Sequence, residues 1–375
     1  MIPIKEKPAA GINPISQTHF TDHLAVICYI MNIPLIFLDP SDHTLAQHYY
    51  PGLNAQYVEY DNFSPEYLVS NYEVLFMSDM WDNKSFHAKF AQLEMKYGKE
   101  MRHIFCPHGF SDKGFYLKLA AQEDIVLTYG QNMLDQLEHH NVLHHMKNIV
   151  ITGNYRYTYY KEHQQFYDDL VTNEVLKKFI KEQPVILYAP TWSDFEDSTT
   201  FFDCCSEIIG NLPSSYNMIV KLHPRLELDD AGKYFSIIGK YERKPNLVFL
   251  KDFPPVFPLL AHTDIYLGDM SSIGYDFLKF NKPMFFLNKN NRDAETDRGL
   301  YLFRCGTEIK ADGFNNIYKI IEDELKHDHK KFTKIRNEIY EYTFGNEIPF
   351  SKIKNEIIEA YNQPQGSYNG IITRK

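Results

Sequence analysis

The sequence predicts an α/β protein built from two Rossmann-like domains that face a central cleft. Three observations lead to this fold. The chain has 375 residues, which exceeds one ordinary hydrophobic core and fits two domains. Short apolar runs alternate with amphipathic stretches, a pattern typical of parallel sheets covered by helices on both faces. The alternation stops in a charged, tyrosine-rich helical stretch at 154–183 and then starts again.

The first half of the chain carries the pattern of one such sheet. Buried strands are expected at 35–38, 74–78, 102–106, 125–128 and 148–152. Helices are expected at 21–30, with Thr21 or Asp22 as its N-cap, and at 86–97. This series defines a first domain over residues 1–160, and residues 161–183 are interpreted as the linker that follows it.

The second half repeats the pattern. Strands are expected at 185–189, 217–221, 248–250, 264–268 and 283–287. Helices are expected at 201–209, at 272–280 and across most of 315–361. We interpret residues 184–345 as the second domain, and residues 346–375 as a helix and tail that return to the first.

Composition and charge exclude several classes of protein. With 44% apolar and 23% charged residues, the chain has the composition of a globular protein rather than a disordered one. Its formal net charge of -10 would repel a long polyanion, so we expect no nucleic-acid partner. The five cysteines lack the spacing of a metal site and are typical of reduced thiols in a cytosol.

Signals for export and membrane insertion are also missing from the sequence. The first eight residues lack the apolar segment of a signal peptide. The most apolar stretch, residues 24–38, is shorter than the ~20 residues that cross a bilayer. We therefore expect a cytoplasmic protein, with peripheral contact at the inner face of the cell membrane as a further option. The basic stretch 326–336 would suit such a contact.

A basic cluster follows the expected strand at 217–221. Lys221, His223 and Arg225 come at its end, and Pro224 stops the strand there. Arginine can hold two phosphate oxygens at once, and lysine and histidine add charge-assisted donors. The cluster therefore indicates a phosphate site at the mouth of the second sheet, although a solvated strand end would look the same.

A second group of polar residues follows the expected strand at 264–268. Asp269, Ser271 and Ser272 form a small turn into a helix, and Asp276 lies one turn into that helix. A serine there can cap the helix, whose first amides attract phosphate. The simpler interpretation is an N-cap without a ligand. Thr191, just after the strand at 185–189, offers a hydroxyl and an amide at the same edge.

In the first domain, His108 and Gly109 follow the expected strand at 102–106. Proline and glycine on either side of His108 predict a tight, exposed turn from which the imidazole projects. A histidine can take a proton from a hydroxyl nucleophile, although most of the 16 histidines are expected to be structural or solvated. Lys113, a few residues later, is positioned to steer an acceptor phosphate. No dinucleotide fingerprint, P-loop or metal-ligand spacing occurs in the sequence.

Taken in order, these motifs resemble one family, the CDP-glycerol glycerophosphotransferases, which prime and polymerise teichoic acids and related capsular polymers. The resemblance is carried by His108-Gly109, Gly153-Asn154-Tyr155-Arg156, Ala189-Pro190-Thr191-Trp192, Lys221-Leu222-His223-Pro224-Arg225 and Asp269-Met270-Ser271-Ser272 with Asp276. Residues 282–286 and 297–301 are also similar to stretches of that family. It covers the chain from residue 102 onwards. Ser193 and Asp194 depart from the pattern, because an arginine usually follows the Pro-Thr-Trp stretch.

The resemblance implies a GT-B fold and a transferase that moves glycerol phosphate, or a related polyol phosphate, from a CDP-alcohol donor. The acceptor would be a hydroxyl of a cell-surface glycan or of a lipid-linked molecule, and CMP would be released. By resemblance, His108 is the base and His223 a second catalytic residue, with no metal or other cofactor. The residues that the resemblance implies for donor binding are Thr191, Lys221, Arg225, Asp269, Ser271, Ser272 and Asp276. Acceptor binding falls to Gly109 and Lys113.

Two other functions fit the same residues. One is a GT-B glycosyltransferase that uses the phosphate grip for a nucleotide sugar and breaks the bond at the sugar carbon. The other is an inactive homologue that binds a nucleotide or a glycan. The retained pairing of His108-Gly109 with Asp269-Met270-Ser271-Ser272 favours phosphotransfer over both.

Overall fold

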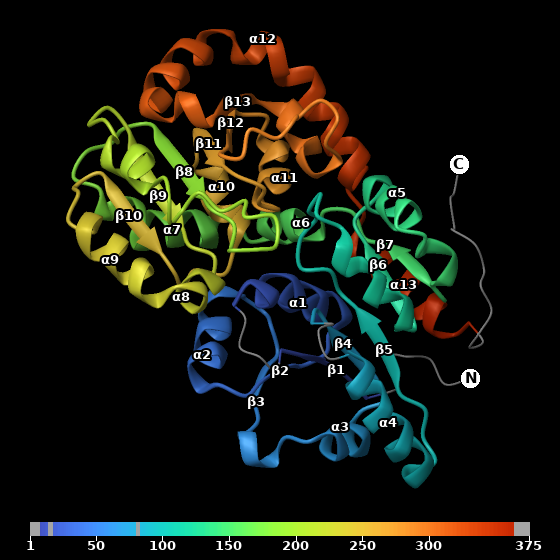
Figure 1. Cartoon of the computed structure of the whole chain (residues 1–375). Coiled ribbons are helices and arrows are strands. Elements are labelled where there is room, and N and C mark those ends of the chain that lie inside the picture. The colour runs from blue at the N-terminus through green and yellow to red at the C-terminus, as the bar shows by residue number, and fades with distance from the viewer. Residues whose placement is uncertain (1–7, 14–17, 80–82, 364–375) are drawn as a thin grey trace. The chain divides into compact units, whose positions relative to one another are not determined.

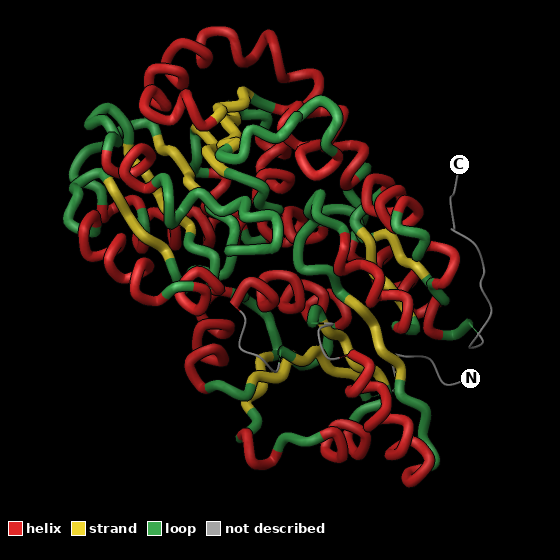
Figure 2. Tube along the Cα trace, viewed as in Figure 1, coloured by secondary structure: helices red, strands yellow, loops and turns green. Residues whose placement is uncertain are grey.

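In the computed structural model, residues 8–13, 18–79 and 83–363 are described (Figure 1). The chain forms two compact units. The first contains Met1–Phe110, Gly114–Tyr159 and Tyr342–Lys375, and the second contains Ser111–Lys113 and Tyr160–Glu341. In each unit a sheet is flanked by helices (Figure 2). The predicted α/β fold with two Rossmann-like sheets is therefore confirmed.

The sheet of the first unit has seven strands in the order β3-β2-β1-β4-β5-β6-β7, and its pairings are parallel. Its strands are β1 (Ala9–Ile12), β2 (Leu35–Phe37), β3 (Ala55–Tyr57), β4 (Val74–Met77), β5 (Arg102–Phe105), β6 (Ile125–Thr128) and β7 (Ile149–Ile151). Its helices are α1 (Thr18–Met31), α2 (Pro40–Tyr49), α3 (Pro65–Asn71), α4 (Asn83–Tyr97) and α5 (Gln131–His139), and α6 (Tyr155–Glu162) leads out of it.

The sheet of the second unit has six strands in the order β10-β9-β8-β11-β12-β13, again in parallel. These are β8 (Val185–Ala189), β9 (Asn217–Lys221), β10 (Leu247–Leu250), β11 (Ile265–Gly268), β12 (Met284–Asn288) and β13 (Thr307–Lys310). The helices are α7 (Gln164–Glu174), α8 (Arg225–Asp229), α9 (Ala231–Tyr241), α10 (Val256–Ala261), α11 (Ile273–Phe277) and α12 (Ile317–Phe344). The final helix, α13 (Phe350–Tyr361), packs on α1 and β7 of the first unit.

Apolar packing on both faces explains why the strands are continuous apolar runs. Side chains alternate between the two faces of a strand, so every residue of a strand covered on both sides meets a helix. On one face of the second sheet, Ile186, Met218 and Leu267 form a core with Tyr234 of α9 and Ile321 of α12. All five side chains are almost fully buried. Burial of such residues is the main stabilising contribution to the unit.

Strand order determines where each sheet offers a binding site. In the second sheet the chain order reverses between β8 and β11, and in the first sheet it reverses between β1 and β4. Ligands of open α/β sheets bind beyond the C-terminal ends of the strands at such a reversal. The turns that follow β8, β11 and the neighbouring β9 are therefore the expected place for a ligand in the second unit.

The structure corrects several predicted elements. Helix α1 begins at Thr18, so Thr21 and Asp22 lie inside it and do not cap it. Asp22 is instead buried and accepts hydrogen bonds from Arg156 at 2.7 Å and Tyr50 at 2.9 Å. The predicted helix at 201–209 is a turn followed by one π-helical turn at Ser206–Gly210. Strands β1, β3 and β13 were not predicted, because their sequences lack a run of large apolar residues.

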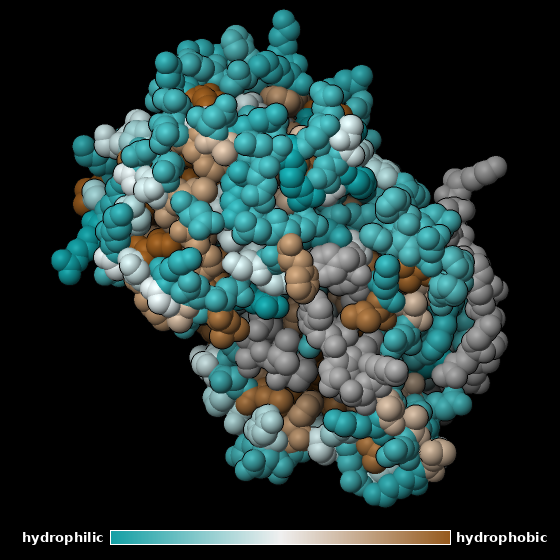
Figure 3. Space-filling model, in the orientation of Figure 1, coloured by the Kyte–Doolittle hydropathy of each residue, from teal (hydrophilic) through white to brown (hydrophobic). Residues whose placement is uncertain are grey.

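Large apolar side chains that remain exposed are spread over the surface. On the face shown in Figure 3, hydrophobic residues form separate patches between hydrophilic ones. Phe195 is the most exposed of the large apolar side chains among the described residues, with 91% of its surface accessible. It lies in the loop after β8, which is one of the turns at the C-terminal edge of the second sheet.

Candidate functional site

The predicted site residues lie at the C-terminal edges of the two sheets. His108 and Gly109 follow β5 in the first unit. The remaining candidates belong to the second unit: Thr191 follows β8, Lys221 ends β9, His223 and Arg225 come next, Asp269, Ser271 and Ser272 follow β11, and Asp276 lies in α11. Lys113 also belongs to the second unit, although it is only five residues after His108.

The His108 imidazole is held in one tautomer by the first sheet. Its Nδ1 lies 3.2 Å from the carbonyl oxygen of Ser78, the residue that follows β4. Because a carbonyl only accepts hydrogen bonds, Nδ1 carries the proton and Nε2 carries the lone pair. Burial lowers the pKa of His108 to about 4, and the contact with Ser78 opposes this shift. The imidazole is therefore neutral at pH 7 and has the form of a general base.

The turn around His108 is mostly buried, contrary to the predicted exposed turn. Pro107 and Gly109 are buried, and the His108 ring packs 4.5 Å from the Phe20 ring. Gly109 adopts a φ of 116°, which L side chains rarely adopt, so a glycine is required here. Its amide donates to the Tyr129 hydroxyl at 3.0 Å. These contacts fix the direction in which the imidazole points.

At the reversal point of the second sheet, Asp269 ties the turn after β11 to the turn after β8. Its Oδ1 accepts a hydrogen bond from the Thr191 amide at 2.8 Å. Its Oδ2 accepts two hydrogen bonds of 3.1 Å from the amide and hydroxyl of Thr200. Burial raises the pKa of Asp269 to about 6, and these hydrogen bonds oppose the rise. The carboxylate thus holds the turn after β11 to the turn after β8, and the donor-binding role that the sequence predicts for it stays a prediction.

Lys113 lies in this same loop network. Its ammonium forms an ion pair with Asp194, and the two side chains are 7% and 0% exposed. The ammonium also donates to the Thr191 hydroxyl at 3.1 Å. The sequence predicts an acceptor-side role for Lys113, but the structure places its charge on a carboxylate of the second unit. Asp194 is one of the two positions after the Pro-Thr-Trp stretch that depart from the family pattern, and this departure supplies the partner of Lys113.

His223, Arg225 and Trp192 form a second cluster at this edge. The amide of Arg225 donates to His223 Nδ1 at 3.2 Å, so the neutral imidazole carries its proton on Nε2. The Arg225 guanidinium lies 4.1 Å from the centre of the Trp192 ring, in a cation–π contact. Lys221, the last residue of β9, is 9% exposed. The cluster thus combines a cation with an imidazole N–H donor.

The serines after β11 do not form the predicted helix cap. Ser272 stands before α11 with helical φ and ψ and makes no side-chain capping bond, and the amide of Ser271 donates to the Asp269 carbonyl at 2.8 Å. Asp276 is 4% exposed inside α11. A small pocket adjoins this turn, lined by Ser111, Asp112, Asp269, Met270, Ser271, Tyr275, Gly299, Leu302 and Phe303. Of the predicted residues, it brings together Asp269 and Ser271.

Asp112 and Arg298 are polar groups of this pocket region that the sequence did not single out. Asp112 accepts hydrogen bonds from the Tyr275 hydroxyl at 2.6 Å, from Arg298 at 2.8 Å and from the Leu302 amide at 3.1 Å. Burial raises the pKa of Asp112 to about 6, and these donors oppose the rise. Arg298 lies in the stretch 297–301, whose similarity to the family could have identified it as a candidate site residue. Asp112 carried no signal apart from its position between Gly109 and Lys113.

Within 8–13, 18–79 and 83–363, no three or more His, Cys, Asp or Glu side chains are grouped so as to hold a metal ion. Over the same ranges, no helix combines the length and the apolar character needed to span a bilayer.

Comparisons with known proteins agree with these features. A teichoic acid glycerol-phosphate primase of Bacillus subtilis (strain 168) is 29% identical over 145 residues, covering 38% of this chain and 33% of that protein. The teichoic acid ribitol-phosphate polymerase TarL of Staphylococcus aureus (strain NCTC 8325 / PS 47) is 31% identical over 131 residues, covering 32% of this chain and 21% of that protein. These matches therefore span a third or less of the relatives' length.

The fold is also shared with a solved structure. The wall teichoic acid polymerase TagF superimposes with a TM-score of 0.65 at 15% identity, covering 94% of this chain and 88% of that chain. The family model described as CDP-Glycerol:Poly(glycerophosphate) glycerophosphotransferase matches residues 141–347, more than half of the 375 residues and all six strands of the second sheet. The chain therefore belongs to the CDP-glycerol:poly(glycerophosphate) glycerophosphotransferase family.

Proposed function

We propose that this protein is a transferase that moves glycerol phosphate, or a related polyol phosphate, from a CDP-alcohol to an acceptor hydroxyl. The acceptor oxygen attacks the β-phosphorus of the donor in line. The bond between that phosphorus and the bridging oxygen breaks, and CMP leaves with the electron pair. The observation that carries the proposal is the family match over 141–347, which covers the complete second sheet and its polar edge.

His108 acts as the base in this reaction. Its Nε2 lone pair takes the proton of the acceptor hydroxyl as the new P–O bond forms. The low pKa that burial gives the imidazole keeps it neutral at pH 7, and the contact with Ser78 orients it. Gly109 supports acceptor binding through the tight turn that it allows. The acceptor is a hydroxyl of a cell-surface glycan or of a lipid-linked molecule.

The donor diphosphate is bound by the polar edge of the second sheet. Arg225 supplies a fixed cation and His223 an N–H donor, so both counter the negative charge that develops on the departing CMP. The hydroxyls of Thr191 and Ser271 add donors from the two turns that meet at the reversal point. Lys221 adds charge at the end of β9, and Ser272 and Asp276 complete the turn after β11. We assign no metal or other cofactor to the reaction.

This assignment divides the chain by role. We assign residues 1–160 to the acceptor domain, 161–183 to the linker, 184–345 to the donor domain, and 346–375 to the segment that returns to the first domain. The compact units differ from these bounds, because residues 111–113 and 160–183 belong to the second unit and 342–345 to the first. Because the five cysteines are free thiols, we place the protein in the cytoplasm. Peripheral contact with the inner face of the membrane would bring it to a lipid-linked acceptor.

Nucleotide release tests the proposal. The full chain is incubated with CDP-glycerol, CDP-ribitol and a panel of nucleotide sugars, and the nucleotide products are separated by chromatography. We expect CMP from at least one CDP-alcohol when a lipid-linked glycan fraction is added. Release of UDP or UMP from a nucleotide sugar, with no CMP from either CDP-alcohol, would contradict the proposal and support a glycosyltransferase.

A further inference from the structure

The loop after β8, residues 193–198, is held on the side of β12 as well as by Lys113. In the second sheet β11 lies between β8 and β12, so a contact between the loops after β8 and β12 has to cross the C-terminal end of β11. The turn that follows β11 is the one that carries Asp269 and Ser271. Residues that join the loops after β8 and β12 therefore extend over the turn after β11.

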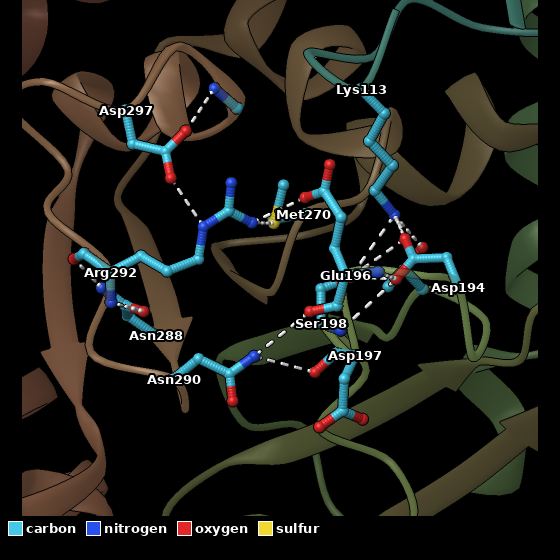
Figure 4. A network of polar contacts seen from close by, with 12 residues as sticks. Lys113, Asp194, Glu196, Asp197, Ser198, Met270, Asn288, Asn290, Arg292 and Asp297 are labelled. Atoms are coloured by element: carbon cyan, nitrogen blue, oxygen red, sulfur yellow. Dashed lines mark hydrogen bonds and ion pairs between the residues drawn. The ribbon is translucent and has the colours of Figure 1, made fainter. Parts of the chain in front are cut away.

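Two residues after β12 hold the tip of the loop. The Lys289 ammonium lies 3.0 Å from an Asp197 carboxylate oxygen and 2.9 Å from one of Asp203. The Asn290 side-chain amide donates to the carbonyl oxygens of Glu196 at 3.3 Å and Asp197 at 3.0 Å. In Figure 4 Asn290 points at the backbone of the loop. The backbone of residues 196 and 197 is thus attached to the β12 side of the sheet.

Arg292 joins all three turns. Its Nε donates to Asp297 at 2.6 Å, in the loop after β12. Its Nη1 donates to Glu196 at 2.6 Å, in the loop after β8, and lies 3.0 Å from the Met270 sulfur, in the turn after β11. Figure 4 shows the guanidinium between Asp297 on one side and Glu196 and Met270 on the other. A planar group with fixed donors suits this arrangement better than a lysine would.

The backbone of Arg292 is itself fixed. The side-chain amide of Asn288, the last residue of β12, donates to the Arg292 carbonyl at 2.7 Å, and its oxygen accepts from the Arg292 amide at 3.0 Å. Asn288 is 4% exposed, so this pair is anchored in the sheet rather than in solvent. The backbone of Arg292 is therefore fixed to the end of β12, and its guanidinium contacts the turns after β8 and β11 from there.

We propose that Arg292 is a positioning residue of the donor site. It sets the spacing between Thr191, after β8, and Ser271, after β11, two of the groups assigned to the donor diphosphate. This inference rests on the proposed function, because it takes that diphosphate as the ligand. Arg292 acts through Glu196 and Met270, and its neighbours Asp297 and Asn288 hold it in place.

Donor kinetics test the positioning role. Substituting Arg292 by glutamine is expected to raise the KM for CDP-glycerol about tenfold, because the donor-binding residues lose their alignment. We expect kcat to change less than about threefold, because His108 is not affected. Arg292→Lys should recover part of the loss, because one of the two carboxylates keeps a cation. Glu196→Gln should raise KM as well, and Arg292→Gln combined with Glu196→Gln should cost less than the product of the single effects.

A spectroscopic readout separates positioning from general stability. Trp81→Phe leaves Trp192 as the single tryptophan of the chain, so its quenching by acrylamide reports the loop after β8. Arg292→Gln in this background should make Trp192 more accessible to acrylamide without any ligand. The matched control is Lys334→Gln, which removes an exposed pair with Glu338 at 3.6 Å on α12. The control should leave KM and quenching unchanged, and thermal unfolding of each variant shows whether it is folded.

The outcomes are distinct. If KM and Trp192 quenching of Arg292→Gln and Glu196→Gln match the control, the positioning role is contradicted. A fall in kcat at unchanged KM also contradicts it, because Arg292 would then act on the reacting group. If the wild-type protein releases no CMP from CDP-glycerol or from CDP-ribitol, the proposed function fails. In that case Trp192 quenching, with and without added CMP, still decides whether Arg292 holds the loop.

Discussion

At the scale of single residues, the two candidate catalytic histidines hold opposite tautomers. His108 has its proton on Nδ1, facing the Ser78 carbonyl, and its lone pair on Nε2. His223 accepts the Arg225 amide on Nδ1, so its proton is on Nε2. One ring is prepared to take a proton and the other to donate a hydrogen bond. The backbone contacts therefore distinguish two residues that look alike in the sequence.

Removing the His108 imidazole should stop the reaction and leave donor binding in place. We expect His108→Ala to lower kcat by about 10²–10⁴-fold, the usual contribution of a general base, with little change in affinity for CDP-glycerol. Transfer is measured as CMP release, and affinity by calorimetry. His48→Ala, at an exposed histidine, is the control and should behave as wild type. Wild-type turnover in His108→Ala would exclude its role as the base.

The pH dependence of the reaction follows from the lowered pKa of His108. Between its folded pKa of about 4 and its ordinary 6.5, the imidazole stays neutral in the folded protein. We therefore expect kcat at saturating donor to persist from pH 7 down to about pH 5. An acid limb centred near 6.5 would show that the base is not the buried His108.

The same shift makes stability depend on pH. Since the folded pKa is depressed, the unfolded chain binds more protons between pH 6.5 and pH 4, and stability falls as the pH falls through this window. His108→Gln should therefore lose roughly 1–2 kcal/mol less unfolding free energy than wild type between pH 7 and pH 5. Denaturant titrations at both pH values measure this difference. An equal loss in both proteins would mean that His108 is not buried as described.

Arg225 should affect the donor rather than the base. Lysine keeps the charge but loses the planar contact with Trp192, so we expect Arg225→Lys to raise the KM for CDP-glycerol. Arg225→Ala should raise it further, by about 1–3 kcal/mol in apparent binding free energy. Steady-state kinetics measure both, with the exposed Arg243→Lys as the matched control. An unchanged KM in Arg225→Ala would remove Arg225 from the donor site.

At the scale of elements, a close approach of two segments attaches the C-terminal region to the first unit. A Cβ on Gly130, just before α5, would lie 2.5 Å from the Thr343 carbonyl oxygen. Thr343 is also fixed by a hydrogen bond of 3.0 Å from Asn132 to its hydroxyl. Because both sides of the Gly130 contact are backbone, neither can move away cheaply. The glycine thus allows the end of α12 to dock beside α5.

Gly130→Ala is therefore expected to destabilise the protein by about 1–3 kcal/mol, the usual cost of overpacking. Chemical denaturation with a probe of the first unit measures the effect. Gly239→Ala, in α9, is the matched control, since nothing lies within 4 Å of its added Cβ. The control should be neutral, or more stable by up to about 1 kcal/mol, because alanine favours a helix. Equal stability of the two variants would contradict the described contact.

Elements that are buried on both faces could be predicted from the sequence, and edge or small-residue elements could not. Strand β8 is a five-residue apolar run and β9 has an apolar centre, Met218–Val220, and both were predicted with their observed ends. Strand β1 is Ala-Ala-Gly-Ile, and β13 is Thr-Glu-Ile-Lys at the sheet edge, so neither has a run of large apolar residues. The predicted helix at 201–209 fails because Thr200 binds Asp269 and holds a turn there. That contact joins residues far apart in the sequence.

The site residues could be located from the rule that ligands bind at the C-terminal ends of strands. The side chains that they contact could not be predicted in this way. His223 and Arg225 could be selected because they follow an apolar run. Nothing in the sequence relates Lys113 to Asp194, although they form a buried ion pair. Arg292 was missed for the same reason. Pairings of this kind depend on which loops the strand order brings together.

At the scale of the whole molecule, each of the two units contains a segment that is separated in the sequence from the rest of that unit. Ser111–Lys113 belongs to the second unit although the residues on both sides belong to the first, and Tyr342–Lys375 belongs to the first. Only Gly109 and Phe110 separate the proposed base, His108, from Ser111, which lines the pocket beside Ser271. The segment that carries the proposed base is therefore joined by two residues to a segment of the second unit that lines this pocket.

The product of the reaction tests the central claim most directly. The full chain is incubated with a lipid-linked glycan fraction and, in parallel reactions, with CDP-glycerol, CDP-ribitol or a nucleotide sugar. The acceptor is analysed by mass spectrometry beside a His108→Ala reaction with CDP-glycerol. We predict that the wild-type product is heavier than the acceptor by one or more glycerol phosphate groups, and that His108→Ala leaves the acceptor unchanged. An acceptor that gains only a sugar from a nucleotide sugar, or that gains nothing from any CDP-alcohol offered, would contradict the account.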